Sequence, residues 1–196
     1  DKTGAFNILG DYPEFNKIDP VEIVKGRFIN YIDIEEKRKV AVIGYRVYEE
    51  LFEKGVEPVS EYIRINGVYF KVAGLFKSKH NGGWAEWQEQ CIFLPFTTLQ
   101  KTFNYGDNVG WFSMTSNSNV PASVAEKKVR AFLKRRHDIH PEDKEAIGSF
   151  NLEEQFLKFK GLFFGIAVLV WIVGTGTLIA GVIGVSNIML VIVRER

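Results

Sequence analysis

The longest apolar segment of the chain runs from Gly161 to Val193 and contains no Asp, Glu, Lys, Arg or His. An α-helix rises about 1.5 Å per residue, and a bilayer core takes roughly 20 apolar helical residues. The segment is therefore longer than one membrane crossing needs and too short for two crossings with a turn. A soluble helix of this length would carry a polar face. We expect one transmembrane helix near Leu162 to Ile183, within a span placed at residues 161–185.

A charged segment without Gly or Pro, residues 151–160, leads into this span. The Asn151 side chain can accept a hydrogen bond from the amide three residues on, and Glu154 stands at the reciprocal position of a capping box. Aromatic rings then recur on one side of the expected helix, at Phe156, Phe159 and Phe163. We expect a helical stalk that is continuous with the span. Its rings either face lipid or a neighbouring core, or pack against a partner helix.

Small residues repeat at every fourth position along one face of the span, at Gly176, Ala180 and Gly184. Small side chains let helices approach closely in lipid, where no hydrophobic force joins them. We therefore expect this face to pack against another membrane helix; the alternative is plain exposure to lipid.

Residues 1–150 alternate between short β-rich and amphipathic segments, which is typical of an α+β domain. Asn66-Gly67 separates Tyr62–Ile65 from Val68–Phe76, and this dipeptide predicts a hairpin because both turn positions need positive φ. The segment from Lys77 to Gln90 is polar and is expected to be a mobile loop. Further strands are expected at 39–44, 91–94 and 109–115, and helices at 45–54, 96–103 and 122–136.

Charge and composition exclude several classes of protein. The formal net charge is +1, and the only cysteine is Cys91, so no internal disulfide can form. No basic surface of the kind that binds nucleic acid is indicated.

Arg194 and Arg196 follow the span, which favours a cytoplasmic C-terminal flank, although Lys158 and Lys160 lie on the other flank.

The sequence offers no catalytic constellation. The phosphate-binding pattern GxxxxGK[ST] is absent, and so are GxSxG and HExxH. His137 and His140 are three apart, but Pro141 follows and no cysteine is near, which argues against a metal site. Trp84 and Trp87 could grip an apolar ligand or simply cover a local core. We assign no catalytic, cofactor-binding or metal-ligating residue to this chain.

The residues from Gly181 to Arg196 (GVIGVSNIMLVIVRER) resemble the second membrane helix of MacB-like ABC transporter permeases. In that family a GGIG-x-x-NIMLVSVTER sequence leads into a cytoplasmic coupling helix. The chain departs from the family at Ser60, where Gly is common, and at Arg194, where Thr is common. Segments upstream are similar to the family's extracytoplasmic domain in order and spacing: Gly26–Phe28, Lys39–Gly44, Leu51–Phe52, Pro58–Phe76 and Phe93–Gln100.

This resemblance implies a two-subdomain extracytoplasmic domain over residues 1–150. A β-rich part would lie near 26–100 and a strand-helix part near 104–150. Residues 186–196 would form a cytoplasmic end that leads to the coupling helix. The residues expected to serve that coupling are Asn187, Met189, Glu195 and Arg196.

The resemblance also implies a longer protein in a bacterial inner membrane, with residues 1–160 outside the cytoplasm. ATP would bind a separate ATPase domain or subunit, and a second permease copy would complete a homo- or heterodimer. A periplasmic adaptor and an outer-membrane channel would be further partners. The protein would transmit ATP-driven motion to the periplasm and expel drugs, peptides or lipoprotein-like cargo.

Two alternatives remain open at this point. A lipoprotein-releasing or FtsX-like permease belongs to the same superfamily but has a different output. A single-span receptor that senses a ligand with its outer domain belongs to another class.

Overall fold

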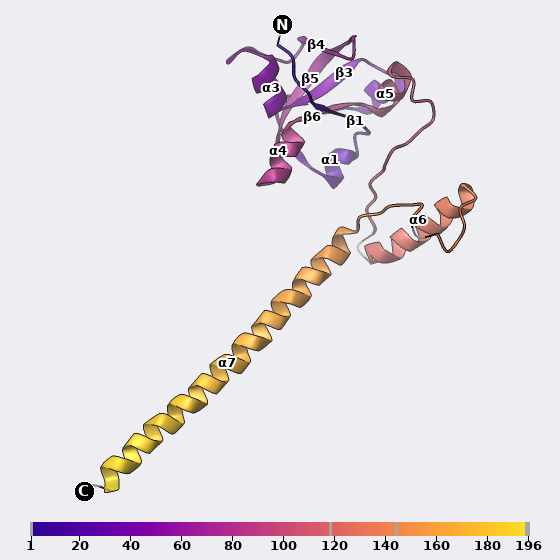
Figure 1. The fold of residues 1–196 in the computed structure, drawn as a ribbon. Helices are drawn as coiled ribbons and strands as arrows, with labels where there is room; N and C mark the ends of the chain where they lie inside the picture. The colour runs from indigo at the N-terminus through magenta and orange to yellow at the C-terminus, as the bar shows by residue number, and fades with distance from the viewer. Residues whose placement is uncertain (1, 118, 144, 195–196) are drawn as a thin grey trace. The chain divides into compact units, whose positions relative to one another are not determined.

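The computed structural model describes residues 2–117, 119–143 and 145–194. The chain divides into two compact units, Asp1–Met114 and Thr115–Arg196. Figure 1 shows a sheet with short helices in the first unit, and two helices in the second. The α+β fold class expected from the sequence is confirmed.

The first unit is built on one mixed sheet whose strands follow the order β1-β6-β3-β5-β2, with β4 paired to β5. β1 runs parallel to β6 and β3 runs parallel to β5, whereas the remaining pairs are antiparallel. The strands are β1 (Asn7–Asp11), β2 (Val21–Gly26), β3 (Val40–Gly44), β4 (Tyr62–Ile65), β5 (Val68–Ser78) and β6 (Cys91–Pro95).

The expected hairpin joins β4 to β5. Asn66 has φ 46° and Gly67 has φ 85°, so both turn positions lie in the left-handed region that this turn requires. Ile65 pairs with Val68, and the ladder continues to Tyr62 and Lys71. The prediction from the dipeptide is confirmed.

Apolar side chains are buried on both faces of the central strand β3, because short helices and loops cover both faces of the sheet. Ile43 joins a core cluster with Phe70 and Leu94. Its neighbour Val42 belongs to the opposite cluster, with Phe76 and Phe93. The helices of this unit are α1 (Phe15–Ile18), α2 (Tyr31–Glu35), α3 (Tyr45–Leu51), α4 (Gly83–Glu89) and α5 (Phe96–Thr102).

A partly buried ion pair holds the start of α2. Arg27 donates two hydrogen bonds to Asp33, at 2.5 and 2.9 Å, and the Asp33 side chain is fully buried. Burial alone would raise the pKa of Asp33, but the hydrogen bonds from Arg27 and from the Asn30 amide outweigh it, so the pKa is lowered. Asn30 and Asp33 also form a capping box.

The prediction of a mobile loop over Lys77 to Gln90 is wrong. β5 continues to Ser78, and α4 occupies Gly83–Glu89. Polar side chains attach this helix to the strand: Ser78 Oγ donates to Gln88 Oε1 at 2.5 Å, and the Ser78 amide donates to Glu89 Oε1 at 3.1 Å. The polar composition that suggested a loop thus supplies the contacts that order the segment.

The strand expected over residues 109–115 is also wrong, because this segment is irregular and no described strand pairs with it. Trp111 instead packs edge-on against Phe15, with ring centroids 5.8 Å apart. The sheet begins at Asn7. The division of the domain into a β-rich part near 26–100 and a strand-helix part near 104–150 stays a prediction.

The second unit contains α6 (Ala122–Arg136) and α7 (Leu152–Arg194). The helix expected over residues 122–136 is confirmed.

Candidate functional site: the long helix α7 and its attachment to α6

α7 is one uninterrupted helix of 43 residues. Asn151 caps it, because its Oδ1 accepts from the Glu154 amide at 3.2 Å. At about 1.5 Å per residue the helix is roughly 65 Å long, about twice the thickness of a bilayer core. The helix has no break at Lys160 or Gly161, where the expected stalk meets the expected span (Figure 1).

α7 is the one helix in the described part of the chain that is long and apolar enough to cross a membrane, by length and composition. Its most apolar part makes no contact that buries it. Thr177 turns its hydroxyl inward and donates to the Val173 carbonyl at 2.9 Å, so this polar group is satisfied within the helix.

The aromatic stripe of the stalk is exposed: the relative exposures of Phe156, Phe159 and Phe163 are 68%, 60% and 67%. On the small-residue face, a Cβ added at Gly176 or Gly184 would meet no atom within 4 Å beyond the neighbouring backbone of its own helix. The structure therefore sets neither of these surfaces against another described segment. Their packing against partner helices stays a prediction.

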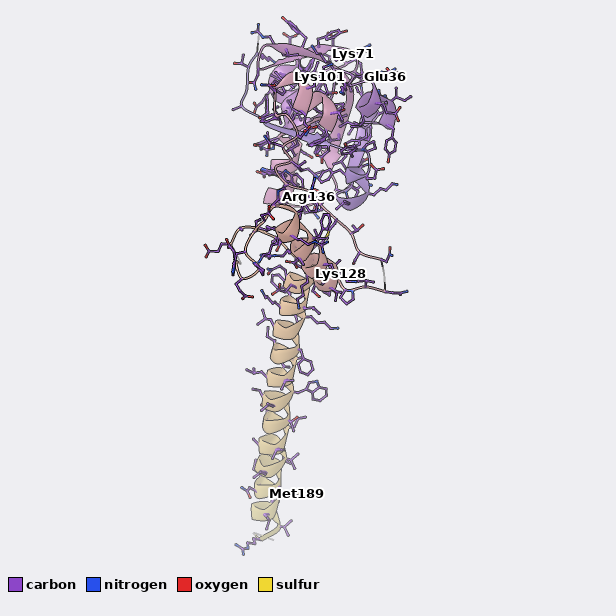
Figure 2. All side chains as sticks on the ribbon, turned by 90° about the vertical axis from the view of Figure 1, so that its right-hand side faces the viewer. Glu36, Lys71, Lys101, Lys128, Arg136 and Met189 are labelled. Atoms are coloured by element: carbon purple, nitrogen blue, oxygen red, sulfur yellow. The ribbon has the colours of Figure 1, made fainter. Side chains whose placement is uncertain are left out.

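Two of the four residues expected to serve cytoplasmic coupling lie at the far end of α7. Asn187 and Met189 are helical and exposed, and Figure 2 labels Met189 near the end of the helix. Glu195 and Arg196 lie outside the described residues.

Side chains at the start of α7 form a polar junction with α6. Glu126 of α6 accepts from Asn151 Nδ2 at 2.8 Å and from Ser149 Oγ at 2.5 Å. Arg130, one turn along α6, donates to Ser149 Oγ at 2.9 Å and lies 3.6 Å from Glu126. The hydrogen bonds from Ser149 and Asn151 lower the pKa of Glu126, which keeps this carboxylate charged.

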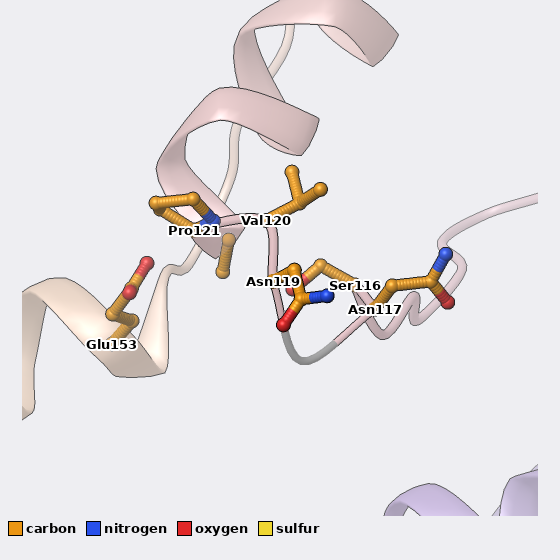
Figure 3. Close-up of a pocket in the computed structure, with 7 residues that line it drawn as sticks. Ser116, Asn117, Asn119, Val120, Pro121 and Glu153 are labelled. Carbon is orange, nitrogen blue, oxygen red and sulfur yellow. The ribbon is translucent and has the colours of Figure 1, made fainter.

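A second contact closes the junction nearer the start of α6. Glu153 Oε2, in the first turn of α7, accepts from the Ser123 amide at 3.2 Å. Figure 3 shows Glu153 across from Pro121, and both residues line a pocket of about 410 Å³. The pocket is lined by Ser116, Asn117, Asn119, Val120, Pro121, Ala122 and Glu153.

Sequence reasoning missed this junction. It predicted a helix over residues 122–136 but no partner for the polar side chains of that helix. The only local signal was the Asn151 cap, and that signal says nothing of a partner 25 residues earlier in the chain.

The contacts at this site join α6 to the start of α7 by hydrogen bonds. Among residues 2–117, 119–143 and 145–194, no group of three or more His, Cys, Asp and Glu side chains is placed to hold a metal ion. Trp84 and Trp87 pack on each other, with ring centroids 5.0 Å apart, on the exposed side of α4. The site is thus a hydrogen-bonded attachment between α6 and α7, which is a candidate membrane helix.

Comparison with known proteins identifies the family of the chain. Residues 1–132 match the model of the MacB-like periplasmic core domain, and the chain belongs to this family. Two curated relatives illustrate the likeness. The macrolide export ATP-binding/permease protein MacB of Shewanella sp. (strain W3-18-1) is 30% identical over 192 residues, which is 96% of this chain. The pyoverdine export ATP-binding/permease protein PvdT of Pseudomonas savastanoi pv. phaseolicola is 25% identical over 187 residues, which is 95% of this chain. The chain spans about 28% of the length of each relative.

Solved structures agree on the fold. The periplasmic region of MacB from Actinobacillus actinomycetemcomitans aligns with a TM-score of 0.56 at 20% identity, covering 69% of this chain and 59% of that one. The extracellular domain of the ABC-type transporter YknZ from Gram-positive bacteria aligns with a TM-score of 0.55 at 17% identity, covering 70% of this chain and 68% of that one.

Proposed function

We propose that this chain is the outer domain and one membrane helix of an ABC exporter permease, and that it transmits motion rather than catalysing a reaction. ATP would be hydrolysed on a separate ATP-binding domain or subunit. The resulting movement would reach the outer domain and expel cargo on the outer side of a bacterial membrane. The names of the relatives contain both ATP binding and export, and this supports the proposal.

The observation that carries the proposal is the continuity of α7. The family match ends at residue 132, inside α6, and α6 is hydrogen-bonded to the first turn of α7. α7 then continues without interruption to Arg194. A continuous helix moves as a unit, whereas a flexible joint would absorb displacement. The last helix of the matched domain is thus connected to the expected span by a stiff element.

We infer that a second copy of the permease completes the membrane part. The small-residue face at Gly176, Ala180 and Gly184 and the aromatic stripe at Phe156, Phe159 and Phe163 would pack against it or against the permease's other membrane helices. Both surfaces are open in this chain, as such contacts require. A periplasmic adaptor and an outer-membrane channel are further proposed partners. Lipid would surround the rest of the span.

The test is to break the helix at the membrane surface in the full-length protein. Replacing Phe159 and Lys160 with Gly should cost about 1 kcal/mol of helix propensity at each site and create a hinge. We expect the variant to reach the membrane and its ATPase to turn over, while export fails because hydrolysis no longer moves the outer domain.

The matched control is Phe159→Leu, which keeps the helix and most of the apolar bulk and should retain most of the export activity. Export by the double-glycine variant at the parental rate would show that helix continuity does not transmit force, and the proposal would be wrong.

A further inference from the structure

We propose that the hydrogen-bonded pair of Glu126 and Asn151 is a positioning joint that fixes the direction in which α7 leaves α6. This inference rests on the proposed function, since a fixed direction matters only if α7 carries displacement. Neither residue touches cargo or nucleotide in the proposal. Each acts by holding the other helix in place.

Asn151 performs two tasks with one side-chain amide. Its Oδ1 accepts from the Glu154 amide at 3.2 Å and caps α7, and its Nδ2 donates to Glu126 Oε2 at 2.8 Å. An amide has one acceptor end and one donor end, so the two contacts leave a single orientation of the group. The cap of the long helix is therefore oriented by a residue of α6.

The other carboxylate oxygen of Glu126 is also hydrogen-bonded. Oε1 accepts from Ser149 Oγ at 2.5 Å, and Ser149 Oγ accepts from Arg130 Nη1 at 2.9 Å. The Glu126 and Arg130 side chains are 21% and 29% exposed, so the group is partly shielded from solvent. Hydrogen bonds to a charged carboxylate are stronger than those between neutral groups, and shielding strengthens them further.

A residue of α7 also caps the start of α6. α6 follows Pro121 and has no side-chain cap of its own. The Glu153 carboxylate supplies the missing acceptor to the Ser123 amide. The partial positive charge at a helix N-terminus favours such an anion. Contacts at Ser123 and at Glu126 lie about one turn apart on α6, and two separated contacts restrain rotation in a way that one cannot.

The experiment exchanges donor and acceptor across the joint in the full-length protein, reconstituted in lipid. Asn151→Asp keeps a good helix cap, because Asp and Asn cap about equally well. It nevertheless sets a second carboxylate against Glu126 and removes the donor. Adding Glu126→Gln restores the bond with its direction reversed, since the introduced glutamine amide can donate to the new carboxylate and still accept from Ser149.

The readout is the distribution of distances between spin labels at Lys128→Cys in α6 and Lys160→Cys in α7. Both positions are exposed and lie outside the joint, and the buried Cys91 should not label. We expect a narrow distribution in the parent, a broadened one in Asn151→Asp, and a narrow one again in the double variant. A broad distance distribution in the double variant, or a narrow one in Asn151→Asp, would contradict the proposal that this pair is a positioning joint.

Export measured in the same variants separates this inference from the proposed function. Loss of export in Asn151→Asp with recovery in the double variant supports both. If the distance distributions respond as expected and export stays at the parental level throughout, the joint stands, and the transmission of force through α7 is wrong.

Discussion

The surroundings of Asp11 strongly change its acid-base chemistry. It ends β1, and its Oδ2 is buried without a hydrogen-bond partner among the described residues. Burial, and secondarily the charge of Asp19, raise its pKa from 3.8 to about 7. Asp19 itself lies 2.6 Å from the His80 ring. The same two carboxylates add to the effect of burial in raising the pKa of the Cys91 thiol to about 12.

The raised pKa predicts that stability depends on pH. The folded chain holds the Asp11 proton more tightly than the unfolded chain, so the contribution of Asp11 to stability is greatest below about pH 4 and is lost as pH rises through about 7. Asn cannot ionise, so Asp11→Asn should be the more stable chain at pH 8, by on the order of 1–3 kcal/mol.

Thermal unfolding in detergent, measured from pH 5 to pH 8, checks this. The gap between the melting temperatures of Asp11→Asn and the parent should widen toward pH 8. Two parallel curves would show that Asp11 ionises in the folded chain as it does in the unfolded one.

Two elements of the first unit, β3 and α4, approach each other closely at Gly44. Gly44 ends β3, and a Cβ placed there would lie 2.1 Å from the Glu89 carbonyl oxygen, which is backbone and has little room to move. The φ of Gly44 is −72°, so the backbone conformation itself suits any residue. Glycine is required here by space alone.

Gly44→Ala should therefore destabilise the chain by roughly 1–3 kcal/mol, because α4 must shift away from the strand. Gly83→Ala is the matched control: it lies in α4, and an added Cβ meets no atom within 4 Å. It should be neutral or slightly stabilising, since Ala favours a helix over Gly. Chemical denaturation compares the two, and equal midpoints would contradict the steric argument.

The sequence predicts an element well where the cause is local. Asn66-Gly67 specifies its own turn, and the apolar residues of β3 and of the span need no partner to be recognised. α4 was missed because its order depends on Gln88 and Glu89 reaching back to Ser78, which composition does not reveal.

The same reasoning separates what was predictable in the candidate site. The Asn151 cap and the length of the apolar helix follow from residues close in sequence, and the structure confirms the cap. The bond from Asn151 to Glu126 joins different helices, so no periodicity or spacing announces it. Non-local pairs of this kind require the fold.

At the scale of the whole molecule, the charged residues that flank α7 bear on its orientation. Basic residues at the end of a span favour the cytoplasm, and Arg194 closes the described helix. Long domains cross the membrane during insertion largely regardless of their charge. The formal net charge of residues 1–160 is zero, so it does not oppose translocation of this domain. We therefore propose that the sheet lies outside the cytoplasm and that Arg194 to Arg196 lie inside.

Labelling in intact cells tests this orientation in the full-length protein. A cysteine at Asn81, exposed between β5 and α4, should react with a membrane-impermeant maleimide. A cysteine at Arg196 should react only after the cells are permeabilised, because a helix of 43 residues is long enough to carry it across the roughly 30 Å core. The native Cys91 is buried and should stay silent in both cases. If both introduced cysteines label equally in intact cells, α7 does not span the membrane in the proposed direction, and it cannot connect an ATPase in the cytoplasm to this domain.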